Sequence, residues 1–151
     1  MSKVFFAVLL LFGTLQAATK WKHQYQFNLK KDQVAKVLIS FRDKKISLRD
    51  GIFTFRWTLY KNRALTTFSS YQKVKSQHIL YKGYKLGSFE VELVPIGSSV
   101  VDRIYLLVVF RDFDEKKGIA KVDVFIKDDK LKILTDFIDP NAKGKNVTKS
   151  R

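Results

Sequence analysis

The chain has no cysteine, and its 151 residues include only two histidines and two prolines. Without cysteine there can be no disulfide and no lipid attached to an N-terminal cysteine, so the core alone must hold the fold. Two histidines without cysteine do not favour a structural zinc site. The sequence also has no nucleophile-elbow motif and no glycine-rich phosphate loop. These absences predict a protein that is not an enzyme and that uses no metal and no cofactor.

The first residues follow the order of a secretory signal peptide. Lys3 supplies a positive charge, residues 4–12 form an unbroken apolar run, and Ala17 is a small residue at the expected cut. A membrane-spanning helix needs ~20 apolar residues, about twice the length of this run. We therefore expect residues 1–17 to be a signal peptide, the mature chain to begin at Ala18, and the protein to be periplasmic or secreted.

Alternation with a period of two residues dominates the rest of the chain. Apolar side chains such as Tyr25 and Phe27 alternate with polar ones such as Gln26, which is typical of a half-buried β-strand. Nine or ten such segments follow one another with turn residues every eight to twelve positions. We expect one all-β domain over residues 18–139 and a disordered basic tail over residues 140–151.

The connections between the predicted strands are short, and Asp50-Gly51 is a strong hairpin signal because glycine accepts the positive φ of a tight turn. Short connections favour sequential, antiparallel neighbours. Closure would remove the exposed sheet edges that a cysteine-free exported protein tolerates poorly. The prediction is therefore a single up-and-down barrel of about 8–10 strands, with a β-sandwich as the alternative.

Bulky aromatic side chains concentrate on the inward faces of the predicted strands. In a barrel of this size they either fill the core or line a cavity for an apolar ligand. Both interpretations stay open, and a hydrogen-bonded histidine among these rings is a core residue or a polar contact to a ligand. The candidate cavity residues are His23, Tyr25, Phe27, Phe53, Phe55, Trp57, Phe89 and Val91.

Residues 74–86 form the least regular part of the pattern. A barrel mouth or a lid is expected to be irregular, so the aromatic residues in and near this stretch are candidates for the cavity mouth. Ordinary loop packing is the alternative. The candidates are Phe68, Tyr71, Tyr81 and Tyr84.

One predicted strand, residues 104–110, is apolar on both faces, whereas a strand of a single sheet normally has one face in water. Tyr105, Leu107 and Val109 point outward and need cover, and Phe125 extends the same patch. A loop, the tail of the chain or a second copy could provide that cover. We expect these four residues to form the interface of a homodimer.

The chain carries 29 Lys and Arg residues against 14 Asp and Glu residues, and its formal net charge is +15. Such a field attracts anionic partners. In an exported protein these are anionic lipid or lipopolysaccharide, whereas nucleic acid is not expected. The alternative is that lysine only keeps a β-rich protein soluble and protects its edges.

The meander, the export signal and the tryptophan at the start of the first strand, Thr19-Lys20-Trp21, resemble the calycin superfamily of lipocalin-like barrels. Thr19 stands where that family has glycine, and Lys127 or Lys132 would have to replace its late arginine. The resemblance implies a cup-shaped barrel that holds a small hydrophobic or amphipathic molecule. The alternative function is a basic interaction module with a filled core that binds an anionic surface or a protein partner.

Overall fold

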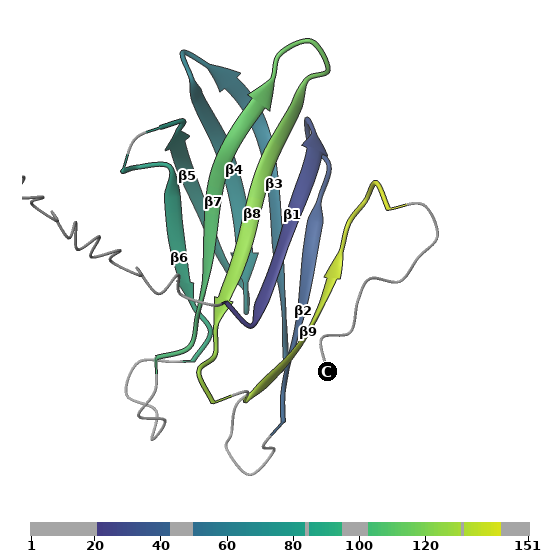
Figure 1. Ribbon diagram of the computed structural model, residues 1–151, viewed down its shortest axis with the longest axis vertical. Coiled ribbons are helices and arrows are strands. Elements are labelled where there is room, and N and C mark those ends of the chain that lie inside the picture. The colour runs from purple at the N-terminus through teal and green to yellow at the C-terminus, as the bar shows by residue number, and fades with distance from the viewer. Residues whose placement is uncertain (1–20, 43–49, 84, 95–102, 131, 143–151) are drawn as a thin grey trace, which may run out of the picture.

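The computed structural model describes residues 21–42, 50–83, 85–94, 103–130 and 132–142. Within these ranges the chain is all-β, with two antiparallel sheets that lie face to face (Figure 1). The four-stranded sheet has the order β1-β8-β7-β6, and the five-stranded sheet has the order β5-β4-β3-β2-β9. The strands are β1 (His23–Lys30), β2 (Ala35–Phe41), β3 (Gly51–Lys61), β4 (Ala64–Tyr71), β5 (Val74–Tyr81), β6 (Ser88–Glu92), β7 (Tyr105–Asp114), β8 (Ile119–Lys127) and β9 (Ile133–Ile138).

The core lies between the sheets, on the faces that the alternating pattern predicts. In β3, for example, Phe53, Phe55 and Trp57 are at most 5% exposed, whereas Arg56 between the last two is exposed. Successive side chains of a strand point to opposite faces of a sheet, so alternate residues of each strand reach one apolar layer. The prediction of an all-β fold is confirmed.

The order of the strands is sequential only in part. Strands β2 to β5 are consecutive neighbours, and so are β6 to β8, as expected for antiparallel neighbours that follow one another in the chain. However, β1 pairs with β8 and not with β2, and β9 pairs with β2 and not with β8. No ladder joins the two sheets within the described ranges, so closure into a barrel stays a prediction.

Two of the hairpins have two-residue turns in the left-handed backbone region. Asn62 and Arg63 join β3 to β4 with φ values of 51° and 62°, and Gln72 and Lys73 join β4 to β5 with 46° and 70°. Positive φ at both central residues is the type I′ geometry, which matches the twist of the flanking strands. Each of these turns therefore sets the register of its hairpin.

The interpretation of Asp50-Gly51 as a hairpin turn is wrong. Gly51 begins β3 and pairs with Ile39 of β2. A Cβ atom on Gly51 would lie 2.6 Å from Cε2 of the Tyr71 ring. Glycine is present here because it leaves room for the buried ring of Tyr71, not because a turn needs positive φ.

The segment expected to be irregular forms the regular strand β5, which pairs with β4 along its whole length. Its sequence lacks a clear apolar alternation because β5 is an edge strand, with most of its side chains exposed. Polar residues and lysine are usual on such an edge, where they discourage pairing with other chains. The prediction of an irregular segment is therefore wrong for residues 74–81.

Several predictions fall on residues outside the described ranges. The expected signal peptide (1–17), Tyr84 and most of the expected tail (140–151) are among them. Trp21 is described. The alternation predicts that it shares the inward face of the first strand with Tyr25 and Phe27, and this prediction is wrong. The Trp21 ring packs against Phe125 at 5.2 Å and Tyr105 at 6.4 Å between centroids, on the outer face of the four-stranded sheet.

A buried polar cluster joins the two sheets at one end of β1. Oγ1 of Thr135 in β9 lies 3.0 Å from Nδ1 of His23 in β1, and Nε2 of His23 lies 3.5 Å from Oδ2 of Asp128. The same carboxylate accepts hydrogen bonds from the amides of Lys132 and Ile133, at 2.8 and 2.9 Å. We name these three side chains, His23, Asp128 and Thr135, the Asp128 cluster.

All three members of the Asp128 cluster are less than 5% exposed. Burial raises the pKa of the Asp128 carboxyl, but hydrogen bonds from His23 and from two backbone amides outweigh burial and hold the pKa below its usual range. A buried carboxylate with satisfied oxygens is stable in its charged form. The cluster therefore fixes the β8–β9 turn and the position of β9.

Asp128→Asn should lower the free energy of unfolding at neutral pH by about 1–3 kcal/mol, because the buried donors lose a charged acceptor. The folded pKa of Asp128 lies below the unfolded value of ~3.9, so its stabilisation is complete above that value and is lost as the pH falls through the folded pKa. We expect the wild type and the variant to converge in stability on acidification, as measured by urea titration at a series of pH values.

Asp129→Asn is the matched control. The Asp129 side chain is 74% exposed and lies 3.7 Å from Nζ of Lys127. Loss of an exposed ion pair of this kind changes stability by at most about 1 kcal/mol. Equal losses for the two variants, or an Asp128→Asn effect that does not depend on pH, would contradict the role given to the cluster.

Candidate functional site

The candidate cavity residues all lie between the two sheets, where they pack against one another. Phe27, Phe53, Phe55 and Trp57 are buried, and the rest belong to the same core or lie against it. Rings from opposite sheets touch directly. The centroid distances are 5.4 Å for Trp57 and Phe113, 6.3 Å for Phe55 and Phe89, and 6.3 Å for Phe27 and Phe137. At these points side chains of the protein occupy the space that a ligand would need.

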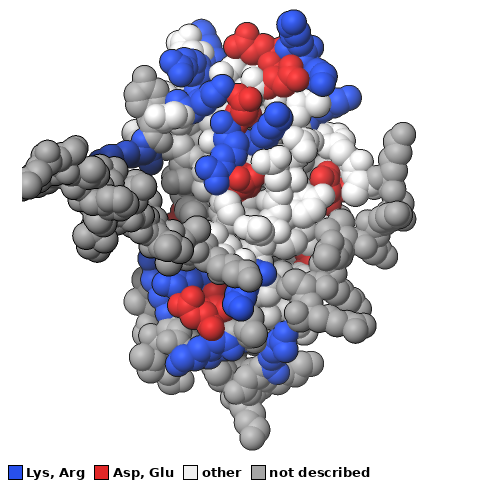
Figure 2. Space-filling view, in the orientation of Figure 1, with Lys and Arg blue, Asp and Glu red and all other residues white. Residues whose placement is uncertain are grey.

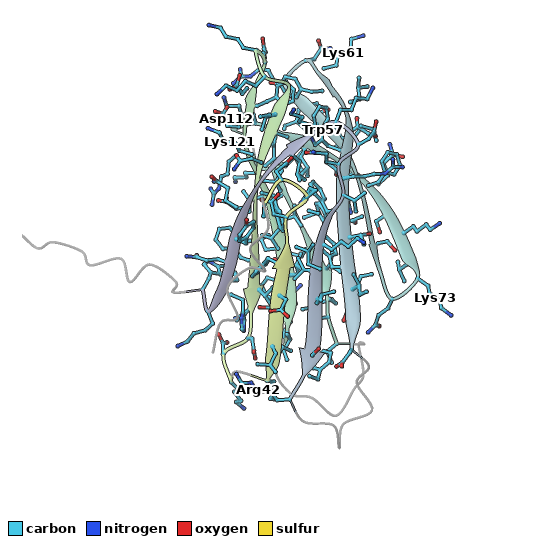
Figure 3. All side chains as sticks on the ribbon, turned by 90° about the vertical axis from the view of Figure 1, so that its right-hand side faces the viewer. Arg42, Trp57, Lys61, Lys73, Asp112 and Lys121 are labelled. Carbon is cyan, nitrogen blue, oxygen red and sulfur yellow. The ribbon has the colours of Figure 1, made fainter. Side chains whose placement is uncertain are left out.

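Trp57, His23 and Tyr25 each use their polar atoms inside the protein. The indole Nε1 of Trp57 donates a hydrogen bond of 2.8 Å to the carbonyl oxygen of Leu29, and Figure 3 shows the residue between the sheets. His23 belongs to the Asp128 cluster. The hydroxyl of Tyr25 donates to Asp139 at 3.0 Å, and burial together with this carboxylate raises the pKa of Tyr25. None of these three residues therefore directs a polar group into an empty ligand cavity.

The three described candidate mouth residues do not come together. Phe68 lies on the outer face of the five-stranded sheet, as does the exposed Tyr81, whereas Tyr71 is buried on the inner face. The Tyr71 hydroxyl donates to the carbonyl oxygen of Leu93 at 3.4 Å. Because these strands are regular, the residues alternate between the two faces of the sheet and cannot form one rim.

The four candidate interface residues share the outer face of the four-stranded sheet, as predicted. Leu107 and Phe125 are Cα partners in the β7–β8 ladder, and all four residues are half-buried. Trp21 covers part of this apolar stripe, and two arginines cap it. Cζ of Arg103 lies 4.5 Å from the Tyr105 ring centroid and Cζ of Arg111 lies 5.7 Å from that of Phe125.

Charge is distributed unevenly over this face of the molecule. Figure 2 shows Lys and Arg at its upper and lower ends and a largely uncharged area between them. The arginines beside the stripe are held in ion pairs. Nη2 of Arg103 lies 2.6 Å from Oε2 of Glu90, and Nε of Arg111 lies 2.6 Å from Oδ2 of Asp123. Much of the positive charge near the stripe is thus already neutralised by the protein itself.

A groove of about 470 Å³ lies on the outer face of the five-stranded sheet, over β3, β4 and β5. Two adjacent rows of side chains cross these strands, because the residues of each row are Cα partners in the ladders. One row is Thr54, Ser70 and Lys75, and the other is Arg56, Phe68 and Gln77. The groove therefore combines hydroxyl groups, an amide and an aromatic ring with two cationic side chains.

The two cations of the groove are available to a ligand. The guanidinium of Arg56 lies over the Phe68 ring at 5.4 Å and 3.5 Å from the carboxylate of Asp32, and its side chain is 46% exposed. Lys75 forms no ion pair with any described residue. The ring holds the planar guanidinium in place, and the donors that Asp32 does not use can reach a second anion. A carboxylate or phosphate is the chemistry that this arrangement fits.

A second hollow, a crevice of about 250 Å³, lies on the inner side of the same hairpin. It opens where β5 and β6, the edge strands of the two sheets, separate. Phe53, Tyr71, Val74 and Val91 supply apolar walls, and Ser69 and Ser76 are small residues at inward positions. The ring of His78 in β5 stacks on that of Phe89 in β6, with 3.7 Å between centroids and 6° between planes.

The sequence indicates part of the groove and nothing of the crevice. The alternation already assigns Thr54 and Arg56 to the outward face of their strand. What the sequence does not give is the register that brings Ser70 and Lys75 beside them. The crevice depends on the separation of two sheet edges, which no periodicity reports.

Within the described residues, no three His, Asp or Glu side chains gather in a group that could hold a metal ion. No helix in the same part of the chain is long and apolar enough to cross a membrane. No family model matches the chain, and neither the curated proteins nor the solved structures contain a significant match.

Proposed function

We propose that this chain is an exported binding module, with its two sheets packed as a sandwich, and that the groove over β3, β4 and β5 binds an anionic head group. The observation that carries the proposal is the placement of Arg56 and Lys75 beside two hydroxyl groups and an amide in one groove. Its volume of about 470 Å³ lies within the usual range of small-molecule sites, ~300–1,000 Å³. The formal net charge of +15 adds long-range attraction for anionic surfaces.

An internal ligand, the first interpretation of the sequence, is less well supported. Rings from the two sheets are in contact at several points along the interior, so a ligand there would have to displace aromatic side chains. Separation of such rings exposes large apolar areas and costs packing energy. The groove needs no rearrangement, and its ligand is the head group of an anionic lipid or lipopolysaccharide.

The groove can be tested with a soluble phosphate monoester, ethyl phosphate, by calorimetry at low salt. The double variant Arg56→Gln, Lys75→Gln should weaken binding by at least about tenfold, because each charge-assisted hydrogen bond contributes ~1.5 kcal/mol or more. Binding of the wild type should also weaken as salt is raised, since exposed charges are screened. The wild type should also bind vesicles of phosphatidylcholine with phosphatidylglycerol more tightly than the double variant does.

Lys61→Gln, Lys121→Gln is the matched control, because it removes the same charge from exposed positions far from the groove. Figure 3 shows Lys61 at the upper end of the molecule and Lys121 on the other sheet. Only the long-range part of the attraction should be lost, so the control should weaken binding by less than about threefold. Equal losses of affinity in the two double variants would show that binding depends on the overall positive charge and not on the groove. No binding by the wild type would refute the proposal.

The stripe of Tyr105, Leu107, Val109 and Phe125 supports a second proposal, a homodimer formed through the outer face of the four-stranded sheet. Trp21 and two arginines cover it only partly, and a two-fold contact would bury the same stripe on both copies. A dimer would leave both grooves free, since they lie on the other sheet. The two proposals are therefore compatible.

Sedimentation velocity should show a dimer that Leu107→Glu converts to a monomer, because a buried unpaired carboxylate is costly. Leu59→Glu is the control, since Leu59 is 53% exposed on the outer face of the other sheet and should leave the dimer intact. A monomeric wild type, or dissociation by both variants alike, would refute the dimer.

A further inference from the structure

The crevice on the inner side of the β4–β5 hairpin adds a partly apolar compartment to the groove on its outer side. Its volume of about 250 Å³ is below the ~300 Å³ at which sites for whole drug-sized ligands begin. It can therefore take part of a ligand only. Its walls combine apolar side chains, among them the buried Phe53 and the half-buried Val91, with polar ones, among them Gln72 and Glu92.

Small residues create the crevice. Ser69 and Ser76 are Cα partners in the β4–β5 ladder, and both occupy inward positions. The inward positions on either side of them carry large side chains, Tyr71 on β4 and His78 on β5. A pair of serines in such a layer leaves volume that the neighbouring rings do not fill. Tyr71 cannot swing away from this space freely, because its ring lies against Gly51.

Groove and crevice lie on opposite sides of the same ladder. Ser69 and Ser76 line both hollows, and Lys75 of the groove is flanked in sequence by Val74 and Ser76 of the crevice. Since β5 is the edge strand of its sheet, no further strand of that sheet blocks the way from one face to the other. A ligand passes over a single strand, whose width is ~4.8 Å. Val74, on this path, is 68% exposed.

We propose that the ligand is an anionic amphiphile with a straight alkyl chain, whose head group binds in the groove and whose chain turns over the free edge of β5 into the crevice. This inference rests on the proposed function of the groove and specifies its ligand class. A flexible chain suits the path because it can bend over the edge, whereas a rigid apolar ligand cannot. The chain is the occupant that matches both the apolar walls and the continuity with a cationic groove.

The test compares two phosphate monoesters that share a head group, octyl phosphate below its micelle concentration and ethyl phosphate. Each methylene removed from water should tighten binding by about fourfold, so burial of two or more methylenes makes octyl phosphate the tighter ligand by at least about tenfold. Val91→Trp and, independently, Val74→Trp, which change residues of the crevice that do not line the groove, should reduce this advantage to less than about threefold by filling the crevice or its entrance. Both variants should bind ethyl phosphate as the wild type does, which shows that the fold and the groove are intact.

Ser88→Leu is the control, because it adds similar bulk at an exposed outward position of β6 and should keep the full advantage of octyl phosphate. Equal affinities of the wild type for the two esters would overturn the inference while leaving the groove in place. An advantage that survives both crevice-filling variants would also overturn it, since the chain would lie elsewhere. Failure of the wild type to bind either ester would instead refute the proposed function and this inference with it.

A competition experiment distinguishes the two sources of the amphiphile, which are a membrane lipid and a free amphiphile in solution. Displacement of the protein from phosphatidylglycerol vesicles by octyl phosphate, but not by ethyl phosphate at equal concentration, supports a membrane lipid as the source. Binding of octyl phosphate without any binding to vesicles supports a free amphiphile. Both results are compatible with the inference, and both require the crevice variants to behave as stated.

Discussion

Direct contact between aromatic rings of opposite sheets is the interaction on which the rest of the structure depends. The ring of Trp57 packs edge to face against that of Phe113, and Phe27 packs against Phe137 in a similar geometry. Each ring buries a large apolar area, and offset or perpendicular pairs add a favourable electrostatic term. Because the chain has no disulfide, this layer supplies the stability that a cross-link would otherwise provide, and it fills the interior in doing so.

Because ring contacts occupy much of the interior, the proposed binding site lies at the surface and at a sheet edge. The groove and the crevice are two places where space remains, and side chains that are small or polar determine both of them. Ser69 and Ser76 leave the crevice beside the rings, and the rows that contain Ser70 and Gln77 leave the groove on the outer face. Both hollows border β5, the strand with the fewest buried side chains in its sheet. The proposed site thus lies at the strand that contributes least to the core of its sheet.

The sequence was sufficient for the class of fold and for the choice of inward residues, because alternation reports directly which face of a strand is buried. It also identified the stripe that contains Leu107, since two apolar faces on one strand are visible in the pattern. It failed for β5, whose edge position removes the alternation, and for Gly51, whose role depends on a ring twenty residues away. Trp21 was misplaced because alternation cannot tell where a strand begins. The pairing of β1 with β8 depends on contacts between distant segments, which local patterns do not report.

The central claim is that a ligand binds the outer face of the five-stranded sheet and leaves the interior undisturbed. An NMR titration of the isotopically labelled protein with ethyl phosphate tests it most directly. The amides of Arg56, Ser70 and Lys75 should shift, whereas the indole N–H of Trp57, which donates to the carbonyl oxygen of Leu29, should stay in place. A saturable shift of the Trp57 indole signal together with the amides of Phe27 and Phe55, and none at the groove, would contradict the account.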